Sequence, residues 1–162
     1  MLLHFYKMTG AGNDFVMVDN RDLSLSSVLD RETIEALCDR RFGIGADGLI
    51  AVEPSQGKGG IVRMRYYNAD GGEAEMCGNG ARCICRYGFE TGLAGETQRV
   101  ETTAGLVTGQ RIDRQQYRIR LNDPTTLTMD FPLQACGKEY RMAYVELGDP
   151  GLPHAVVEMP GL

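Results

Sequence analysis

Short apolar runs, separated by glycine-rich or polar turns, alternate with two helical patterns along the chain. Strands are predicted at residues 4–8, 15–19, 49–52, 62–67, 98–103, 106–112, 117–121, 131–135, 139–147 and 155–158. Helices are predicted from a cap at Asp30 through Arg41, and from Gly78 to about Glu90. In the first helix, Ile34, Leu37 and Cys38 recur at the spacing of one buried face. The pattern therefore indicates a mixed fold of helices and strands.

A break in this pattern suggests where the chain divides. Asp123-Pro124 interrupts the run of strands, and the residues beyond it read as a second, hairpin-rich segment. We place a boundary near residues 122–130, which gives a first lobe at 1–122 and a second segment at 123–162. The letters show no tandem repeat and no low-complexity segment.

Composition and charge narrow the class of partner. A chain of 162 residues with 43% hydrophobic and 24% charged residues can form one domain or two small lobes that share a core. The net charge of -5 argues against nucleic acid or a membrane surface, because no basic face is available. A small polar substrate fits better. The start MLLHFYKMTGAGND lacks the apolar run of a signal peptide, so a cytoplasmic location is expected.

The cysteine pattern favours free thiols over disulfides or a metal site. The five cysteines are Cys38, Cys77, Cys83, Cys85 and Cys136. An odd count without an export signal indicates reduced thiols. The spacing C-x5-C-x-C lacks the paired ligands of a zinc site, so no metal is expected. We expect Cys38, Cys83 and Cys85 to pack as small hydrophobes, and Cys136 to lie in a hairpin turn.

The stretch NADGGEAEMCGNGARC places Cys77 directly before Gly78-Asn79-Gly80, where the second helix should begin. A helix N-terminus favours the anionic form of a thiol, and the free N–H groups expected at Gly78, Asn79 and Gly80 can bind a carboxylate or phosphate. A thiolate beside a bound carboxylate can remove the proton from the adjacent carbon. This pattern predicts proton abstraction at the α-carbon of an amino acid. The alternative is a thiol that is simply buried at a helix start.

Five segments follow one another along the chain: KMTGAGNDFVMVDNR, RRFGIGADGL, NADGGEAEMCGNGARC, ETTAG and, as a weaker match, GLPHAVVE. Together they resemble the diaminopimelate epimerase family, a family of cofactor-independent amino acid epimerases. The resemblance extends over essentially the whole chain. It implies two similar α/β lobes, each a barrel-like mixed sheet around a central helix, with the substrate in the cleft between them.

The resemblance also implies a mechanism in which two cysteines, one on each face of the substrate carbon, exchange the roles of base and acid. By position, Cys77 corresponds to one catalytic thiol, and Gly78 and Asn79 offer N–H groups to the α-carboxylate. Asn13 and Asn68 correspond to polar contacts with the distal end of the substrate. His154 corresponds to a histidine near the second thiol. No pyridoxal phosphate is implied, because N–H groups replace its electron sink.

Three departures from the family pattern bear on these roles. Leu152 stands where an asparagine usually precedes Pro-His, and Gly48 stands where some relatives carry glutamine. Family members are considerably longer, and the second catalytic cysteine is not found before Leu162. Cys136 is rejected for that role, because Lys138 and Glu139 follow it in place of the small and hydroxyl residues of an anion nest.

The expectation is therefore a first lobe and the start of a second, inactive as an epimerase without the rest of the enzyme. The full enzyme would interconvert LL- and meso-diaminopimelate for lysine and peptidoglycan precursor synthesis. A related racemase acting on proline or hydroxyproline, and a noncatalytic anion-binding or redox-thiol module, remain alternatives. Asn13 and Asn68 could be turn formers, and His154 a loop residue. The sequence does not determine the oligomeric state, and a homodimer is one alternative.

Overall fold

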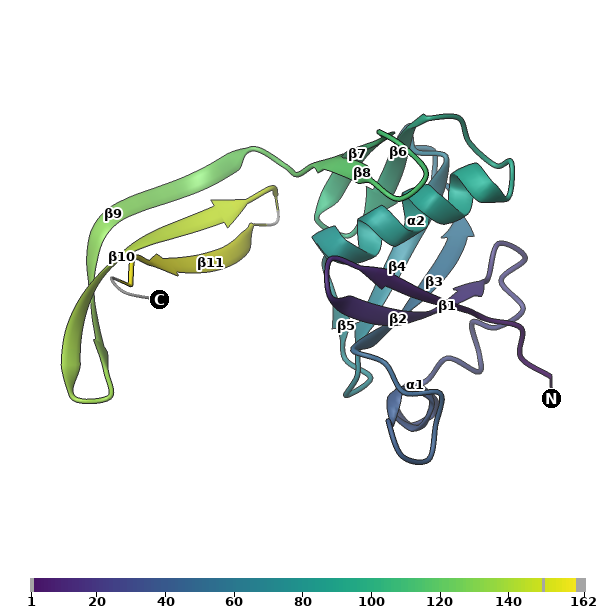
Figure 1. Ribbon diagram of the computed structural model, residues 1–162, viewed down its shortest axis with the longest axis horizontal. Helices are drawn as coiled ribbons and strands as arrows, with labels where there is room; N and C mark the ends of the chain where they lie inside the picture. Colours follow the sequence, from purple (N-terminus) through teal and green to yellow (C-terminus); the bar gives the residue numbers. More distant parts are fainter. Residues whose placement is uncertain (1, 150, 160–162) are drawn as a thin grey trace. The chain divides into compact units, whose positions relative to one another are not determined.

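A computed structural model describes residues 2–149 and 151–159 of the chain. The chain divides into two compact units, residues 1–121 and residues 122–162 (Figure 1). Among the described residues, no helix has the length and apolar character needed to span a bilayer. The two units are described in turn.

A curled mixed sheet forms the frame of the first unit. Its strands are β1 (Tyr6–Gly10), β2 (Asn13–Asp19), β3 (Gly48–Pro54), β4 (Val62–Asn68), β5 (Glu73–Ala74), β6 (Thr97–Thr102), β7 (Gly105–Arg111) and β8 (Tyr117–Arg120), in the order β1-β2-β3-β4-β6-β7-β8 with β5 paired to β4. The pairs β2/β3 and β4/β6 are parallel and the others antiparallel. Helix α2 (Gly78–Glu90) contacts both edge strands, β1 and β8, which only a curled sheet allows (Figure 1). The predicted barrel-like sheet around a central helix is confirmed.

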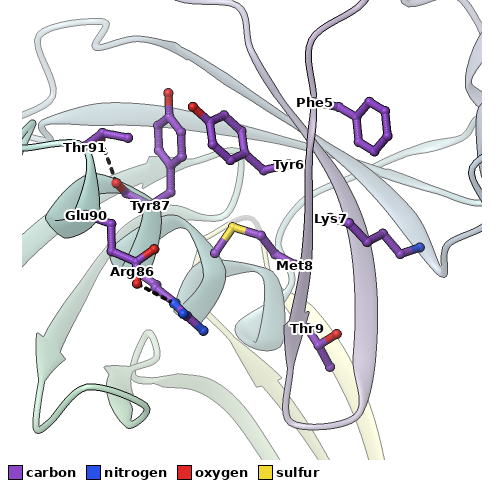
Figure 2. Close-up of a pocket in the computed structure, with 9 residues that line it drawn as sticks. All are labelled: Phe5, Tyr6, Lys7, Met8, Thr9, Arg86, Tyr87, Glu90 and Thr91. Atoms are coloured by element: carbon purple, nitrogen blue, oxygen red, sulfur yellow. Dashed lines mark hydrogen bonds and ion pairs between the residues drawn. The ribbon is translucent and has the colours of Figure 1, made fainter.

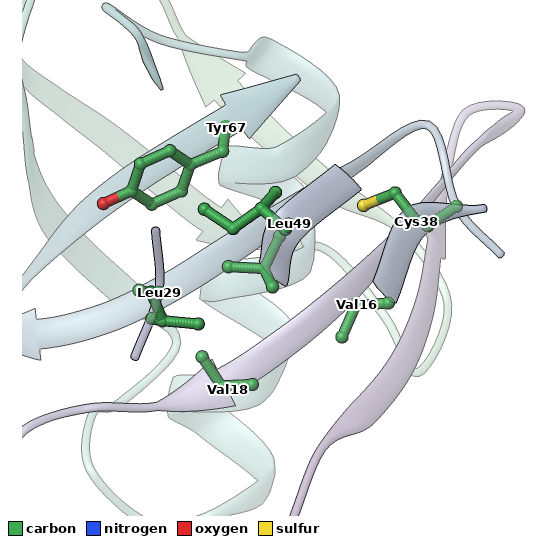
Figure 3. Close-up of a cluster of buried hydrophobic side chains, with 9 residues drawn as sticks. Val16, Val18, Leu29, Cys38, Leu49 and Tyr67 are labelled. Carbon is green, nitrogen blue, oxygen red and sulfur yellow. The ribbon is translucent and has the colours of Figure 1, made fainter. Parts of the chain in front are cut away.

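The two faces of this sheet carry separate apolar layers, because successive side chains of a strand point to opposite faces. The convex face packs against helix α1 (Arg31–Cys38). The buried apolar cluster between this face and α1 includes Val16, Val18, Leu29, Ile34, Cys38, Leu49, Ala51 and Tyr67 (Figure 3). The intervening residues Met17, Ile50 and Met64 are equally buried and face α2. A sheet covered on both faces requires near-continuous apolar strands, which explains the run Leu49–Val52.

Helix α1 begins where the sequence predicts and ends earlier. The carboxylate of Asp30 accepts the N–H of Thr33 at 2.8 Å, which is the predicted N-cap. The helix ends at Cys38 instead of Arg41. Asp39 turns out of the helix at ψ 126°, and its Oδ1 accepts the N–H groups of Arg41 and Phe42, each at 2.7 Å. The side chain thus supplies the local bonding that another helical turn would have provided.

Helix α2 has the predicted bounds, and small residues allow it to lie close to the sheet. Gly80, in its first turn, sits where a Cβ would be 2.9 Å from Cδ1 of Ile50. Further along, a Cβ on Gly109 of β7 would be 2.1 Å from Sγ of Cys85. Cys85 is fully buried. The helix and the sheet therefore meet at distances that larger residues would prevent.

An ion-pair network ties the loop after α1 to the start of β2. Arg40 donates to Oδ1 of Asp14 at 2.7 Å and to Oδ1 of Asp47 at 2.8 Å, and Lys7 lies 2.8 Å from Oδ2 of Asp14. The Arg40 guanidinium, followed by the Lys7 ammonium, holds the pKa of Asp14 well below its usual range. The N–H of Asp14 also donates to the Asp47 carboxylate at 3.1 Å. These contacts fix Asp47 beside Asn13.

The second unit is a three-stranded antiparallel sheet in the order β11-β10-β9. Its strands are β9 (Pro124–Ala135), β10 (Lys138–Leu147) and β11 (Leu152–Val157). Strand β9 begins at Pro124, seven residues before Phe131, where the sequence predicts the start of this strand. Proline is tolerated at the first position of a strand. Cys136 and Gly137 form the two-residue hairpin turn at φ 51° and 73°, which confirms the predicted turn.

We predict that Gly109→Ala lowers the free energy of unfolding by about 1–3 kcal/mol, because the new methyl group overlaps Cys85. Chemical denaturation measures this change. Gly95→Ala is the matched control, because no atom lies within 4 Å of a Cβ at that position. In a Cys85→Ala background the sulfur is absent, and Gly109→Ala should cost less. An equal cost in both backgrounds would contradict the assigned contact.

A second prediction concerns the loss of stability at acidic pH. The folded-state pKa of Asp14 is depressed, so its stabilising contribution is present above the unfolded value of about 3.9 and is lost as pH falls toward the folded value. Arg40→Gln removes the largest cause of that depression. The free energy of unfolding should therefore fall less between about pH 6 and about pH 3 in this variant than in the wild type.

Arg41→Gln is the control for this measurement, because Arg41 makes no ion pair within residues 2–149 and 151–159. Carboxyl titration by NMR should also show the Asp14 pKa rising in Arg40→Gln and unchanged in Arg41→Gln. Parallel stability curves for Arg40→Gln and the wild type would refute the prediction.

Candidate functional site

Cys77 occupies the N-cap of α2, in the last extended residue before the helix, at φ -135° and ψ 117°. Its side chain is half-buried. Its Sγ accepts the N–H of Gly80 at 3.4 Å, and its carbonyl accepts the N–H of Ala81 at 2.8 Å. The sulfur thus replaces the oxygen of a usual N-cap side chain and lies against the first turn of the helix.

The N–H groups of the next two residues remain open. Within the part of the chain that the structure describes, no protein acceptor takes the N–H of Gly78 or Asn79. These are orphan donors of the first helical turn, and they carry the positive end of the helix dipole. The sequence also predicted a free N–H at Gly80, which is wrong because the Cys77 sulfur accepts it. Two donors, not three, are available beside the thiol.

A chain of side-chain amides connects this helix start to the sheet. Asn79 donates through Nδ2 to Oδ1 of Asn13 at 2.7 Å, and Asn13 donates through Nδ2 to Oδ2 of Asp47 at 3.0 Å. Arg82 donates to Oδ1 of Asn79 at 2.7 Å. The structure thereby brings Asn13 and Asn79 into direct contact. A Cβ on Gly10 would be 2.5 Å from the Asn79 carbonyl oxygen, so only glycine allows this approach.

Strand register places Asn68 in the same region. Phe15 pairs with Gly48, and Gly48 pairs with Asn68, so the ends of β2, β3 and β4 are aligned. Alternation along the strands puts Asn13, Gly48 and Asn68 on the face that meets α2. Oδ1 of Asn68 accepts the hydroxyl hydrogen of Tyr66 at 2.9 Å. Asn68 is exposed at the end of its strand.

The predicted residue His154 lies in the second unit. It stands opposite Val145 in the β10/β11 ladder, is exposed, and its Nδ1 donates to the carbonyl oxygen of Leu152 at 3.0 Å. Its role beside a second thiol stays a prediction.

The other four thiols lie where the sequence predicts, three packed as buried side chains and one in a hairpin turn. Cys38, Cys83 and Cys85 are buried, whereas Cys136 is exposed in its hairpin turn. Burial raises the pKa of Cys83 to about 11 and that of Cys85 to about 12. These two thiols therefore stay protonated at neutral pH. In the described ranges 2–149 and 151–159, no group of three or more acidic, histidine or cysteine residues could hold a metal ion.

A groove of about 750 Å³ lies at the other end of α2, between that helix and β1. Figure 2 shows Tyr6 and Met8 on the helix side of β1, with Lys7 and Phe5 on the opposite side. The Tyr6 and Tyr87 rings meet edge to face at 5.2 Å. Cys77 does not line this groove. The groove is therefore distinct from the candidate site at the helix N-terminus.

Sequence reasoning missed three polar side chains at this site: Asp47, Tyr66 and Arg82. Asp47 lies within the segment RRFGIGADGL, and Arg82 lies one helical turn after Asn79. Their spacing indicates a turn and a helix face, but not the partners they meet. The partner of Asp47 is Asn13, which is distant in the sequence. Arg82 and Tyr66 instead contact near neighbours, Asn79 and Asn68, and no local signal marks these contacts.

Comparisons with known proteins agree with this fold and these motifs. The family profile described as Diaminopimelate epimerase matches residues 5–125. A diaminopimelate epimerase from Synechocystis is 39% identical over 93% of this chain and 58% of its own length, and one from Moorella thermoacetica is 40% identical over 98% of this chain and 62% of its own. The chain thus spans about 58% of the length of the Synechocystis relative.

Solved structures with little sequence identity share the fold. A probable proline racemase from Agrobacterium radiobacter covers 97% of this chain and 52% of its own, with a TM-score of 0.69 at 14% identity. A hydroxyproline epimerase from Agrobacterium vitis covers 95% of this chain and 51% of its own, with a TM-score of 0.68 at 14% identity. Because the fold, the ordered motifs and the identity to the curated relatives agree, this chain belongs to the diaminopimelate epimerase family.

Proposed function

We propose that this chain supplies the first catalytic thiol and the α-carboxylate site of an enzyme that interconverts LL- and meso-diaminopimelate. The observation that carries the proposal is the arrangement at the start of α2. A half-buried sulfur at Cys77 is followed by two N–H groups, of Gly78 and Asn79, that no described protein acceptor takes. The curated relatives named diaminopimelate epimerase support the choice of substrate.

The proposed reaction is a proton exchange at one α-carbon. The Cys77 thiolate removes the α-proton, and the electron pair of the broken C–H bond moves toward the substrate carboxylate. The N–H groups of Gly78 and Asn79 stabilise that developing charge. A second thiol then protonates the carbon from the opposite face, which inverts its configuration. The N–H of Gly80, aimed at Sγ, stabilises negative charge on the sulfur before the transfer.

The second thiol is not assigned to this chain. Cys38, Cys83 and Cys85 are buried, and Cys136 occupies a hairpin turn with strand residues on both sides. We propose that the second unit is the beginning of a second lobe that carries this thiol farther on, with His154 near it. Exposed apolar side chains in the second unit, such as Leu127 and Met129, support a sheet that more chain would cover.

Asn13 and Asn68 complete the proposed site as contacts for the distal amino and carboxylate groups of the substrate. Their carboxamides lie on the α2 side of aligned strands. We also propose that the enzyme needs no pyridoxal phosphate, acts in the cytoplasm, and serves lysine and peptidoglycan precursor synthesis. The free state of the described cysteines supports a reducing compartment.

We predict that Cys77→Ala abolishes epimerisation of diaminopimelate by the full-length enzyme while leaving its fold intact. The wild type, in heavy water, should incorporate deuterium at the α-carbon, and the variant should not. Cys136→Asn is the matched control, because Asn-Gly suits a two-residue hairpin turn with positive φ at both positions. Retained exchange in Cys77→Ala would exclude the sulfur as the base, and exchange into proline alone would exclude the proposed substrate.

The two open N–H groups can be tested with a proline. Gly78→Pro removes one donor at the first helical position, where proline fits, and the extended Cys77 before it suits a residue that precedes proline. We predict a fall in kcat of about 100-fold or more. Gly78→Ala keeps the N–H and places its Cβ at an ordinary 3.5 Å from Leu121, so it should retain most activity. Equal activity in both variants would contradict the carboxylate site.

A further inference from the structure

The glycine at position 48 leaves space that a neighbouring side chain fills. A Cβ on Gly48 would lie 2.4 Å from the carbonyl oxygen of Tyr67 and 2.7 Å from Cε2 of Tyr66. It would also lie 3.2 Å from the Tyr66 hydroxyl. The phenol of Tyr66 therefore stands where a longer residue at position 48 would have to extend, directly beside Asn68.

Tyr66 is held in this position by its surroundings. Its ring meets the ring of Phe15 edge to face, with centroids 6.0 Å apart, and its backbone pairs with Ile50. Burial raises the pKa of Tyr66 to about 12, with a smaller contribution from the negative charge of Asp47. The hydroxyl therefore remains protonated at neutral pH and acts as a donor. Its acceptor is Oδ1 of Asn68, at 2.9 Å.

The backbone of Asn68 is also fixed. Its N–H donates to the carbonyl oxygen of Gly72 at 2.8 Å, and its own carbonyl accepts the N–H of Gly71 at 2.9 Å. With Oδ1 directed at Tyr66, the planar carboxamide must direct Nδ2 the other way. In the portion of the chain that the structure describes, no acceptor takes Nδ2 of Asn68. The exposed end of this side chain is thus a hydrogen-bond donor.

We propose that Tyr66 is a positioning and specificity-determining residue, which turns the Asn68 amide so that its NH₂ group faces a distal carboxylate of the substrate. Gly48 makes this possible by leaving room for the phenol. The proposal rests on the proposed function for the presence of a substrate, and goes beyond it by naming the group that orients Asn68. An Asn68 amide in this orientation selects amino acids that carry an anionic group at the far end, because an NH₂ group cannot accept a hydrogen bond from an ammonium group.

A double-mutant cycle tests whether Tyr66 acts through Asn68. Tyr66→Phe keeps the ring and removes the hydroxyl, and should lower kcat/KM for diaminopimelate about 3- to 10-fold, mainly through a higher KM. Asn68→Ala removes the amide and should lower it at least as much. In the Asn68→Ala background, Tyr66→Phe should have no further effect. Additive losses would overturn the proposal, because the hydroxyl would then act independently.

The orientation of the amide is tested with 2-aminopimelate, which has both carboxylates and lacks the distal amino group. If NH₂ of Asn68 faces the distal carboxylate, Tyr66→Phe lowers kcat/KM for 2-aminopimelate and diaminopimelate by the same factor. A loss confined to diaminopimelate would mean that Asn68 faces the ammonium, which contradicts the proposal. Tyr67→Phe is the control, because Tyr67 lies on the opposite, convex face of the same strand.

A readout without turnover separates this proposal from the proposed function. In the wild type, the NMR signals of the Asn68 side-chain amide should show restricted motion, and Tyr66→Phe should shift them and increase their mobility. Tyr67→Phe should leave them unchanged. Absence of epimerisation by the wild type would refute the proposed function alone. An Asn68 amide that does not respond to Tyr66→Phe would refute the role of Tyr66, whatever the enzyme converts.

Discussion

The close approach of α2 to the concave face of the sheet is the contact on which the rest of this structure depends. At Gly80 and Gly109 the helix and the sheet meet so closely that an added Cβ would displace the side chains of Ile50 and Cys85. Because packed interiors transmit small displacements, a helix held farther from the sheet would carry its N-terminus away from the strand ends. The contact between Asn79 and Asn13 requires that proximity. Packing therefore decides whether the thiol and the amides form one site.

Two glycines beside the thiol, Gly78 and Gly80, serve different purposes that the sequence motif alone does not distinguish. Gly80 is explained by its packing against Ile50, and its N–H is taken by the Cys77 sulfur. Gly78 has room for a methyl group, and its N–H is open. One residue thus allows the helix to pack, while the other leaves a donor exposed. The same motif, CGNG, joins a structural requirement to a chemical one.

The site is held by polar contacts between segments that are distant in the sequence. Asp47, in the loop after α1, is tied by Arg40 to Asp14 and accepts the bond that orients Asn13. A local contact adds to these: Tyr66 and Asn68 lie two residues apart on the same face of β4, and the Tyr66 hydroxyl donates to Oδ1 of Asn68. Groups oriented before the substrate arrives need not reorganise during the reaction. The groove beside β1 is not lined by Cys77 and lies at the other end of the helix from this candidate site.

The sequence by itself determined the two helices, most strands, the hairpin turn at Cys136 and the position of Cys77 at a helix start. These features depend on periodicity and on turn and cap residues, which act over a few neighbouring positions. The sequence did not predict the short strand β5, because β5 forms only by pairing with β4. It also did not predict that α1 ends at Cys38, because that end depends on the hydrogen bonds of the Asp39 side chain. Only the tertiary structure decided that the start of α2 lies against the strand ends, where Asn79 meets Asn13, and that Asp47 orients Asn13. Those outcomes depend on strand register and on interatomic distances between remote residues, which no local pattern specifies.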